Sequence, residues 1–298
     1  MDYQHDALQR GRGALCALCY VLGENMDKYI INGGNKLYGS VKIQTAKNSV
    51  LPILAAAVLT DEEVRILGAP HISDVKSMVN ILASLGCATE YDGEDIVVDA
   101  SGADSCEIPR ALAHELRSSV FLLGPLIARF GRAKIAYPGG CDIGLRPVDL
   151  HLSGLKRLGV RIREKNGYIL CDCKGLKGNE IMLDCPSVGA TENIMLAAVG
   201  AEGETVIKNA AREPEIEDLQ KFLNGIGAKV RGAGSGTVHI EGVASLGGGA
   251  FRPMADRIEA GTFLIAAAMC GGEIVADGIS GENISSLLHK LRENGCKI

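Results

Sequence analysis

The densest group of side chains that could do chemistry lies in one short segment, residues 138–151 (PGGCDIGLRPVDLH). Cys141 offers a titratable thiol, Arg146 a permanent positive charge, and Asp149 an acceptor for a substrate N–H or O–H. The glycines beside the cysteine let the backbone move and approach a ligand closely. The segment is therefore either a mobile lid that brings acid–base or nucleophilic chemistry to an anionic substrate, or a surface loop with an incidental cysteine.

The composition predicts an acidic protein with an aliphatic core. The 298 residues are enough for one large or two medium domains. Hydrophobic residues make up 47% of the chain and tryptophan is absent, so the core must consist mainly of aliphatic side chains and alanine. The net charge of −5 argues against a nucleic-acid partner, which needs a basic face. Any anion site must therefore be a local cluster of cations.

The ten cysteines have no spacing typical of a zinc site, because Cys16-x-x-Cys19 and Cys171-x-Cys173 lack a second pair of ligands. We interpret most of them as small hydrophobic residues in a reducing cytoplasm. No apolar run is long enough to span a membrane. Residues 1–25 lack the basic start and the cleavage site of a signal peptide, and we interpret them as an unstructured extension.

An internal repeat sets the organisation of the chain. Four segments have the pattern of an amphipathic helix that ends at a small-residue turn and leads into a strand: 74–91, 149–162, 215–230 and 283–298. Each turn contains a glycine, namely Gly86, Gly159, Gly227 and Gly295. Glycine at this place predicts a left-handed residue that closes the helix.

A second series of segments alternates with the first. Its four members, 46–67, 115–136, 187–209 and 256–278, each show an apolar, alanine-rich helix, a short turn and a strand. Because these helices are apolar nearly all round, we expect them to be buried, and the amphipathic helices to lie nearer the solvent. The two series together predict an α/β protein with four copies of a strand–helix unit, the last of which stops at Ile298 as its next strand begins.

The chain from Met26 to Ile298 resembles the UDP-N-acetylglucosamine 1-carboxyvinyltransferase family. Six blocks carry the resemblance in order: TAKNSVLPILAAAVL (45–59), LRSSVFLLGPLIARFG (116–131), PGGCDIGLRPVDLHLSGLKRLG (138–159), PSVGATENIMLAA (186–198), NAAREPEIEDL (209–219) and DRIEAGTFLIAAA (256–268). The sibling 3-phosphoshikimate 1-carboxyvinyltransferases share the fold but lack the cysteine loop and the AKN start, and they remain the nearest alternative family.

The resemblance implies an inside-out α/β barrel fold, built from repeated βαβα-type units in two domains of three units each. Four of the six expected units are present. Residues 47–254 would form a complete second domain, and residues 26–46 and 255–298 an incomplete first one, so that roughly two units are missing. The general-base aspartate of the family falls in the missing part. A catalytically inactive fragment that binds the UDP-sugar is therefore the alternative to an active enzyme.

The reaction implied by the resemblance transfers the enolpyruvyl group from phosphoenolpyruvate to the 3′-hydroxyl of UDP-N-acetylglucosamine and releases phosphate, as the first committed step of peptidoglycan synthesis. It needs no cofactor and no metal. Cys141 matches the cysteine that protonates the methylene carbon, can carry a pyruvate adduct and is alkylated by fosfomycin. The implied phosphoenolpyruvate-binding residues are Lys47, Asn48 and Arg146. Those implied for the UDP-sugar are Asn48, Arg117, Arg146, Pro147, Val148, Asp149, Leu150, Ser187, Val188 and Gly189.

Three further positions bear on this site. We expect His151 to orient its segment by hydrogen bonding rather than to transfer protons. Cys185 stands where many family members have a lysine, so one expected cation is absent. Asn193 is either a further ligand contact or a packing residue. The implied partners are the two small substrates, with no nucleic acid, no membrane and no obligate protein partner, and the implied location is the cytoplasm.

Overall fold

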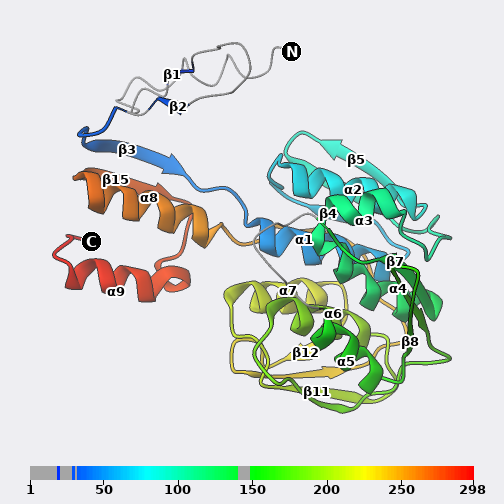
Figure 1. Cartoon of the computed structure of the whole chain (residues 1–298). Coiled ribbons are helices and arrows are strands. Elements are labelled where there is room, and N and C mark those ends of the chain that lie inside the picture. The colour runs from blue at the N-terminus through cyan, green and yellow to red at the C-terminus, as the bar shows by residue number, and fades with distance from the viewer. Residues whose placement is uncertain (1–18, 21–28, 31, 140–147) are drawn as a thin grey trace. The chain divides into compact units, whose positions relative to one another are not determined.

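The computed structural model describes residues 19–20, 29–30, 32–139 and 148–298. Contacts within the chain divide it into two compact units (Figure 1). The larger unit is continuous, Thr45–Met254, and the smaller one combines Met1–Gln44 with Ala255–Ile298.

The larger unit repeats one arrangement three times: an inner helix, a strand, an outer helix and a β-hairpin. The first copy comprises α1 (Lys47–Ala56), β4 (Val64–Ile66), α2 (Ser73–Ser84), β5 (Ala88–Asp92) and β6 (Asp95–Asp99). The second comprises α3 (Arg110–Glu115), η2 (Arg117–Leu122), α4 (Leu123–Phe130), β7 (Arg132–Ala136), α5 (Asp149–Arg157), β8 (Arg161–Lys165) and β9 (Tyr168–Asp172). The third comprises α6 (Val188–Ala198), β11 (Glu204–Lys208), α7 (Pro214–Gly225), β12 (Lys229–Arg231) and β13 (Thr237–Glu241).

Each copy also pairs with the sheet of the next copy, through a strand or through a single bridge residue. Glu107 forms a parallel bridge to Lys134 in β7, and β10 (Glu180–Met182) pairs in parallel with β11. After the third copy, β14 (Gly249–Phe251) returns to pair in parallel with β4 of the first copy. The resulting sheets have the strand orders β14-β4-β6-β5, β7-β9-β8 and β10-β11-β13-β12. The unit is thus a closed cycle of three open sheets rather than one closed barrel.

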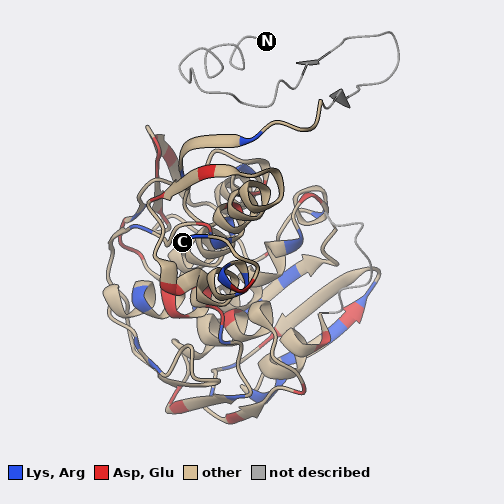
Figure 2. Cartoon of the chain, turned by 90° about the vertical axis from the view of Figure 1, so that its left-hand side faces the viewer, with Lys and Arg blue, Asp and Glu red and all other residues tan. Residues whose placement is uncertain are grey.

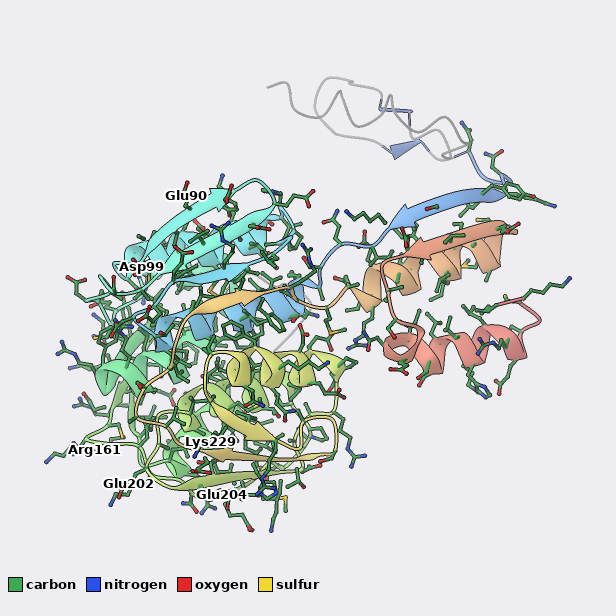
Figure 3. All side chains as sticks on the ribbon, turned by 180° about the vertical axis from the view of Figure 1, so that it is seen from behind. Glu90, Asp99, Arg161, Glu202, Glu204 and Lys229 are labelled. Atoms are coloured by element: carbon green, nitrogen blue, oxygen red, sulfur yellow. The ribbon has the colours of Figure 1, made fainter. Side chains whose placement is uncertain are left out.

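The sheets bury one face and expose the other. The second strand of each hairpin alternates in burial, so that Ile96 and Val98 of β6 point into the core, as do Ile169 of β9 and Val238 and Ile240 of β13. Alternation with a period of two is what a strand needs to bury a single face. Charged side chains such as Glu90, Arg161 and Lys229 stand on the exposed faces (Figure 3).

The inner helices fill the space beneath these sheets, as the sequence predicts. Eight of the ten residues of α1 and nine of the eleven residues of α6 are buried. The middle inner segment differs from a single helix, because the 3₁₀ helix η2 precedes α4. Pro125 lies in the first turn of α4, where its missing N–H would have no acceptor within the helix.

Four helices end in the same hydrogen-bonded turn, which confirms the predicted role of the repeat glycines. After α2, the N–H of Gly86 bonds to the carbonyl of Ala83 and the N–H of Cys87 to the carbonyl of Leu82, both at 3.1 Å. This pair of bonds defines the Schellman motif. The same pair closes the three other helices of the series, α5, α7 and α9 (Ser285–Glu293), at Gly159, Gly227 and Gly295. All four glycines have φ between +85° and +105°.

We expect these glycines to differ in their tolerance of alanine. Gly227→Ala should cost about 1–2 kcal/mol through backbone strain alone, because no atom lies within 4 Å of the place of the new Cβ. Gly86→Ala should cost more, because its Cβ would lie 2.8 Å from the carbonyl oxygen of Gly102. Urea unfolding of the two variants beside the wild type measures the difference, and equal losses would contradict it.

The fourth apolar helix, α8 (Arg257–Cys270), is not buried, and the prediction for it was wrong. Only Ala260 and Gly261 are buried, whereas Met269 is 81% exposed. The other described regular elements of the smaller unit are β3 (Leu37–Lys42), β15 (Gly272–Asp277), η3 (Gly281–Ile284), α9 and the short β1–β2 pair. An apolar sequence allows a helix to be buried, but burial requires neighbouring elements on every side. In the smaller unit, β3, β15, η3 and α9 do not surround α8.

The predicted extension, residues 1–25, lies mostly outside the described residues. Two of its members, Cys19 and Tyr20, form strand β1, which pairs antiparallel with β2 (Tyr29–Ile30). Across the described part of the chain, none of the helices has the length and apolar character to cross a bilayer. Basic and acidic residues are interspersed along the ribbon rather than gathered by sign (Figure 2).

Candidate active site

The inner helices of the larger unit run in the same direction. From η2 through α4, and from the start of α6 to just past its end, Phe121 approaches Gly189, Gly124 approaches Asn193 and Ala128 approaches Gly200. Residue numbers therefore rise together along the two helices, which makes them parallel.

Helix α1 shares this direction. At the end of α4, the Arg129 guanidinium donates to the carbonyls of Val58 and Thr60, at 2.9 and 3.0 Å, just beyond the end of α1. The three inner segments thus end together. Their starts, at Lys47, Arg117 and Ser187, consequently lie at one end of the unit, where the positive ends of the helix dipoles favour anions.

Lys47 is the first residue of α1, but its charge is already paired. Its ammonium group lies 2.8 Å from the carboxylate of Asp74, in the first turn of α2. Both side chains are about two-fifths exposed, at 41% and 37%. The neighbouring Asn48 is exposed. The pair therefore holds a cation at the helix start, where a ligand can still reach it.

The start of α5 lies against the start of α6. Val148 is buried, Asp149 is exposed and Leu150 is half-buried, so the segment is anchored on one side and open on the other. The next residue, His151, is buried and stacks on Phe121, with ring centroids 6.5 Å apart. A Cβ atom at Gly189 would lie 3.1 Å from Cε1 and 3.3 Å from Nε2 of His151. Any side chain at position 189 would therefore force His151 to move.

Residues Ser187, Val188 and Gly189 form the N-terminus of α6. The Ser187 hydroxyl accepts from the N–H of Ala190 at 3.3 Å, and the N–H groups of Val188 and Gly189 belong to the first turn, which has no acceptor within the helix. Cys185, two residues before the cap, is exposed. This helix start can therefore hold an anion through backbone N–H groups.

The electrostatics of this end keep His151 uncharged. Burial lowers its pKa to about 4, and the positive charge of Arg117 acts in the same direction, while Asp149 opposes it weakly. At neutral pH the imidazole is therefore a neutral hydrogen-bonding group, which agrees with the expectation that it orients its segment.

The structure thus brings several predicted site residues together and leaves others untested. His151 has Arg117 and Asp149 as its charged neighbours and lies against the start of α6. Cys141, Arg146 and Pro147 lie outside the described residues. Their roles remain predictions.

Two residues of this region were missed or left open by sequence reasoning. Asp74 was missed, because nothing in the helical pattern of α2 signals a partner 27 positions away. Asn193 was left open between ligand contact and packing. It is fully buried and bonds to three separate segments of the protein, so it serves the fold and not a ligand directly.

The described cysteines agree only in part with the interpretation as buried hydrophobic residues. Cys87 and Cys171 are buried, and burial raises the pKa of their thiols to about 11 and about 12. Such thiols stay protonated and unreactive at neutral pH. Cys185 and Cys270, in contrast, are exposed.

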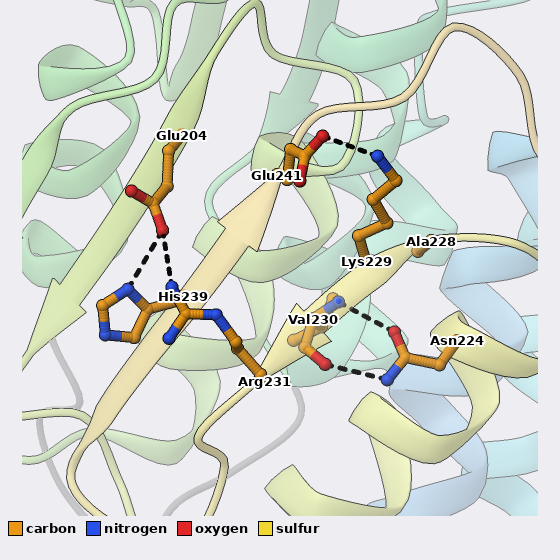
Figure 4. Close-up of a pocket in the computed structure, with 8 residues that line it drawn as sticks. All are labelled: Glu204, Asn224, Ala228, Lys229, Val230, Arg231, His239 and Glu241. Atoms are coloured by element: carbon orange, nitrogen blue, oxygen red, sulfur yellow. Dashed lines mark hydrogen bonds and ion pairs between the residues drawn. The ribbon is translucent and has the colours of Figure 1, made fainter.

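A surface pocket of about 540 Å³ lies on the sheet of the third copy, and none of the predicted site residues lines it (Figure 4). Its charges neutralise one another. Glu204 accepts from Arg231 at 3.0 Å and lies 3.1 Å from His239, and Lys229 donates to Glu241 at 2.6 Å. We therefore treat this pocket as a separate surface feature with paired charges.

Comparison with solved structures defines the class of fold. The chain superimposes on the enolpyruvyl transferase NikO from Streptomyces tendae with a TM-score of 0.72 and 26% identity, covering 88% of this chain and 62% of that one. The EPSP synthase from Acinetobacter baumannii gives a TM-score of 0.72 at 19% identity, over 88% of this chain and 61% of that one. The fold is the inside-out α/β fold of the enolpyruvyl transferases, as predicted.

Sequence comparison then gives the family. A model of the family described as EPSP synthase (3-phosphoshikimate 1-carboxyvinyltransferase) matches residues 31–298, and the chain belongs to this family. Within it, the chain is 54% identical over 273 residues to UDP-N-acetylglucosamine 1-carboxyvinyltransferase 2 of Caldanaerobacter subterraneus subsp. tengcongensis. It is 51% identical over 278 residues to UDP-N-acetylglucosamine 1-carboxyvinyltransferase 1 of Symbiobacterium thermophilum.

These two matches cover 92% and 91% of the chain, and 66% and 63% of the relatives. The chain thus spans slightly less than two thirds of the length of the curated relatives that it matches.

Proposed function

We propose that this protein transfers the enolpyruvyl group of phosphoenolpyruvate to the 3′-hydroxyl of UDP-N-acetylglucosamine, with release of phosphate, in cytoplasmic peptidoglycan synthesis. The observation that carries the proposal is the common end of the three parallel inner helices, where Lys47, Arg117 and Ser187 begin the segments. Two cations and a helix N-terminus suit two phosphorylated substrates. The names of the relatives supply the particular substrates.

Within this proposal each residue has a defined task. Lys47, Asn48 and Arg146 hold phosphoenolpyruvate. Cys141 delivers a proton to its methylene carbon while the sugar hydroxyl oxygen adds to the neighbouring carbon and gives up its own proton to a base. The adduct then loses phosphate together with a proton from the newly formed methyl group, which restores the double bond. The UDP-sugar is held by Asn48, Arg117, Arg146, Pro147, Val148, Asp149, Leu150, Ser187, Val188 and Gly189. The proposal includes Cys141 as the thiol that fosfomycin alkylates.

The experiment measures binding and turnover separately on the purified chain. Calorimetry with UDP-N-acetylglucosamine tests the binding end of the larger unit, and phosphate release on addition of phosphoenolpyruvate tests transfer. Shikimate 3-phosphate is the control acceptor, which separates this reaction from that of the sibling enzymes. Cys141→Ala should abolish phosphate release and leave the affinity for the UDP-sugar within a few-fold of the wild type.

The outcomes differ clearly. Binding of UDP-N-acetylglucosamine with phosphate release supports the proposal, and binding without release restricts this chain to the binding part of the reaction. Binding of shikimate 3-phosphate instead would favour the activity of the sibling 3-phosphoshikimate 1-carboxyvinyltransferases. A Cys141→Ala variant with unchanged turnover would remove the assigned proton donor.

A further inference from the structure

The fully buried Asn193, in the middle of α6, joins three segments of the larger unit. Its amide oxygen accepts from the backbone N–H of Gly124 at 2.7 Å. Its amide nitrogen donates to the carbonyl of Val120 at 2.9 Å and lies 3.1 Å from Nδ1 of His151. The side chain thus uses its acceptor and both of its N–H donors on η2, α4 and α5.

These partners decide which end of the amide carries the oxygen. A backbone N–H can only donate and a backbone carbonyl can only accept, so Gly124 must face the amide oxygen and Val120 the amide nitrogen. An Asn side chain is otherwise ambiguous between two orientations, and here the surrounding network removes that ambiguity. The group that faces Nδ1 of His151 is therefore an N–H donor.

The orientation of Asn193 in turn fixes the tautomer of His151. Because Nδ1 receives a hydrogen bond, it must be the unprotonated ring nitrogen, and the proton of the neutral ring sits on Nε2. The low pKa of about 4 agrees with a ring that stays neutral. The Cε1–Nε2 edge faces Gly189 in the first turn of α6. The outcome is an N–H donor held at the helix start where Val188 and Gly189 already present their backbone N–H groups.

We propose that Asn193 is a positioning residue that locks His151 as the neutral Nε2–H tautomer, and so makes it a fixed hydrogen-bond donor for the UDP-sugar at the start of α6. The part that concerns the ligand rests on the proposed function, whereas the tautomer does not. Donors that are oriented before binding need no reorganisation when an anionic or carbonyl oxygen arrives.

The first test reads the tautomer in the wild-type protein without any ligand. ¹⁵N NMR of the histidine-labelled full chain distinguishes a protonated ring nitrogen from an unprotonated one. We expect His151 to show Nε2 protonated and Nδ1 unprotonated from pH 6 to pH 8. A ring protonated on Nδ1, or a doubly protonated ring at pH 7, would overturn the proposal, and no variant has to fold for this result.

The second test replaces the donor. In Asn193→Asp the carboxylate has no N–H to offer, so it should accept from Nδ1–H and raise the pKa of His151. The affinity for UDP-N-acetylglucosamine should fall about tenfold, the size of one buried hydrogen bond. Asn224→Asp is the matched control. Asn224 also bonds a backbone N–H and a backbone carbonyl, those of Val230 at 2.8 Å each, but contacts no histidine (Figure 4).

A double-mutant cycle then shows whether Asn193 acts through His151. His151→Gln keeps an N–H donor near the place of Nε2 and a side chain that packs on Phe121. If Asn193 works only by orienting the histidine, Asn193→Asp should weaken binding much less in the His151→Gln background than in the wild type. Equal effects in both backgrounds would mean a general packing role and refute the proposal. Should the wild type bind no UDP-N-acetylglucosamine, the proposed function fails, and the NMR result alone decides the role of Asn193.

Discussion

Lys47→Met should lower the affinity for phosphoenolpyruvate about 100-fold while leaving the fold intact. The size follows from removing one member of a charge pair in a binding site, which costs roughly 2–5 kcal/mol. The fold should not suffer, because the Lys47–Asp74 pair is about two-fifths exposed and such pairs contribute only about 0–1 kcal/mol to stability. Calorimetry in the presence of UDP-N-acetylglucosamine measures the affinity, and urea unfolding measures the stability.

Lys229→Met is the matched control for this result. Lys229 forms an ion pair of similar length with Glu241, at 2.6 Å, in the same unit but in the surface pocket away from the inner helix starts. Both partners are about 60% exposed. The control should change the affinity for phosphoenolpyruvate by less than a factor of two. It should change the free energy of unfolding by less than about 1 kcal/mol. Equal losses of affinity in the two variants would show that Lys47 acts only through the overall charge of the protein.

The features that the sequence predicted well are local. A glycine after an amphipathic helix predicts a left-handed turn, and this prediction does not depend on tertiary contacts. All four repeat glycines adopt that conformation: Gly86, Gly159, Gly227 and Gly295. The α/β class followed from the repetition of such local signals, whereas the inside-out arrangement followed from the resemblance to a known family.

The features that the sequence did not reveal depend on distant partners. Helix α8 has the apolar composition of α1 and α6 but stays largely exposed, because burial is decided by neighbouring elements. Asp74 and Asn193 acquire their roles from contacts 27 to 73 positions away along the chain. No periodicity encodes such a contact. Residues 140–147, which include Cys141 and Arg146, are the part of the candidate site that still rests on sequence alone.

Glu192→Gln should stabilise the protein at pH 8 and have little effect near pH 4.5. Glu192 is 1% exposed on α6, and neither carboxyl oxygen has a hydrogen-bond partner within the described residues. Burial raises its pKa well above the ordinary value of 4.5, and the negative charges of Glu215 and Glu213 raise it further. Above pH 4.5 the unfolded chain loses this proton while the folded chain keeps it. The free energy of unfolding therefore falls as the pH rises, up to the folded pKa.

The glutamine variant cannot ionise, so this fall should be absent from it. Relative to the wild type, the variant should therefore gain in free energy of unfolding as the pH rises from 4.5 to 8. Urea unfolding at several pH values measures it, and Glu90→Gln, an exposed carboxyl on β5, is the control whose pH profile should match the wild type (Figure 3). A Glu192→Gln variant with the wild-type pH profile would mean that the folded protein holds this carboxyl ionised. A negative charge would then sit one turn inside the helix that we propose binds the diphosphate, and that helix start would be a poorer anion site than its N–H groups suggest.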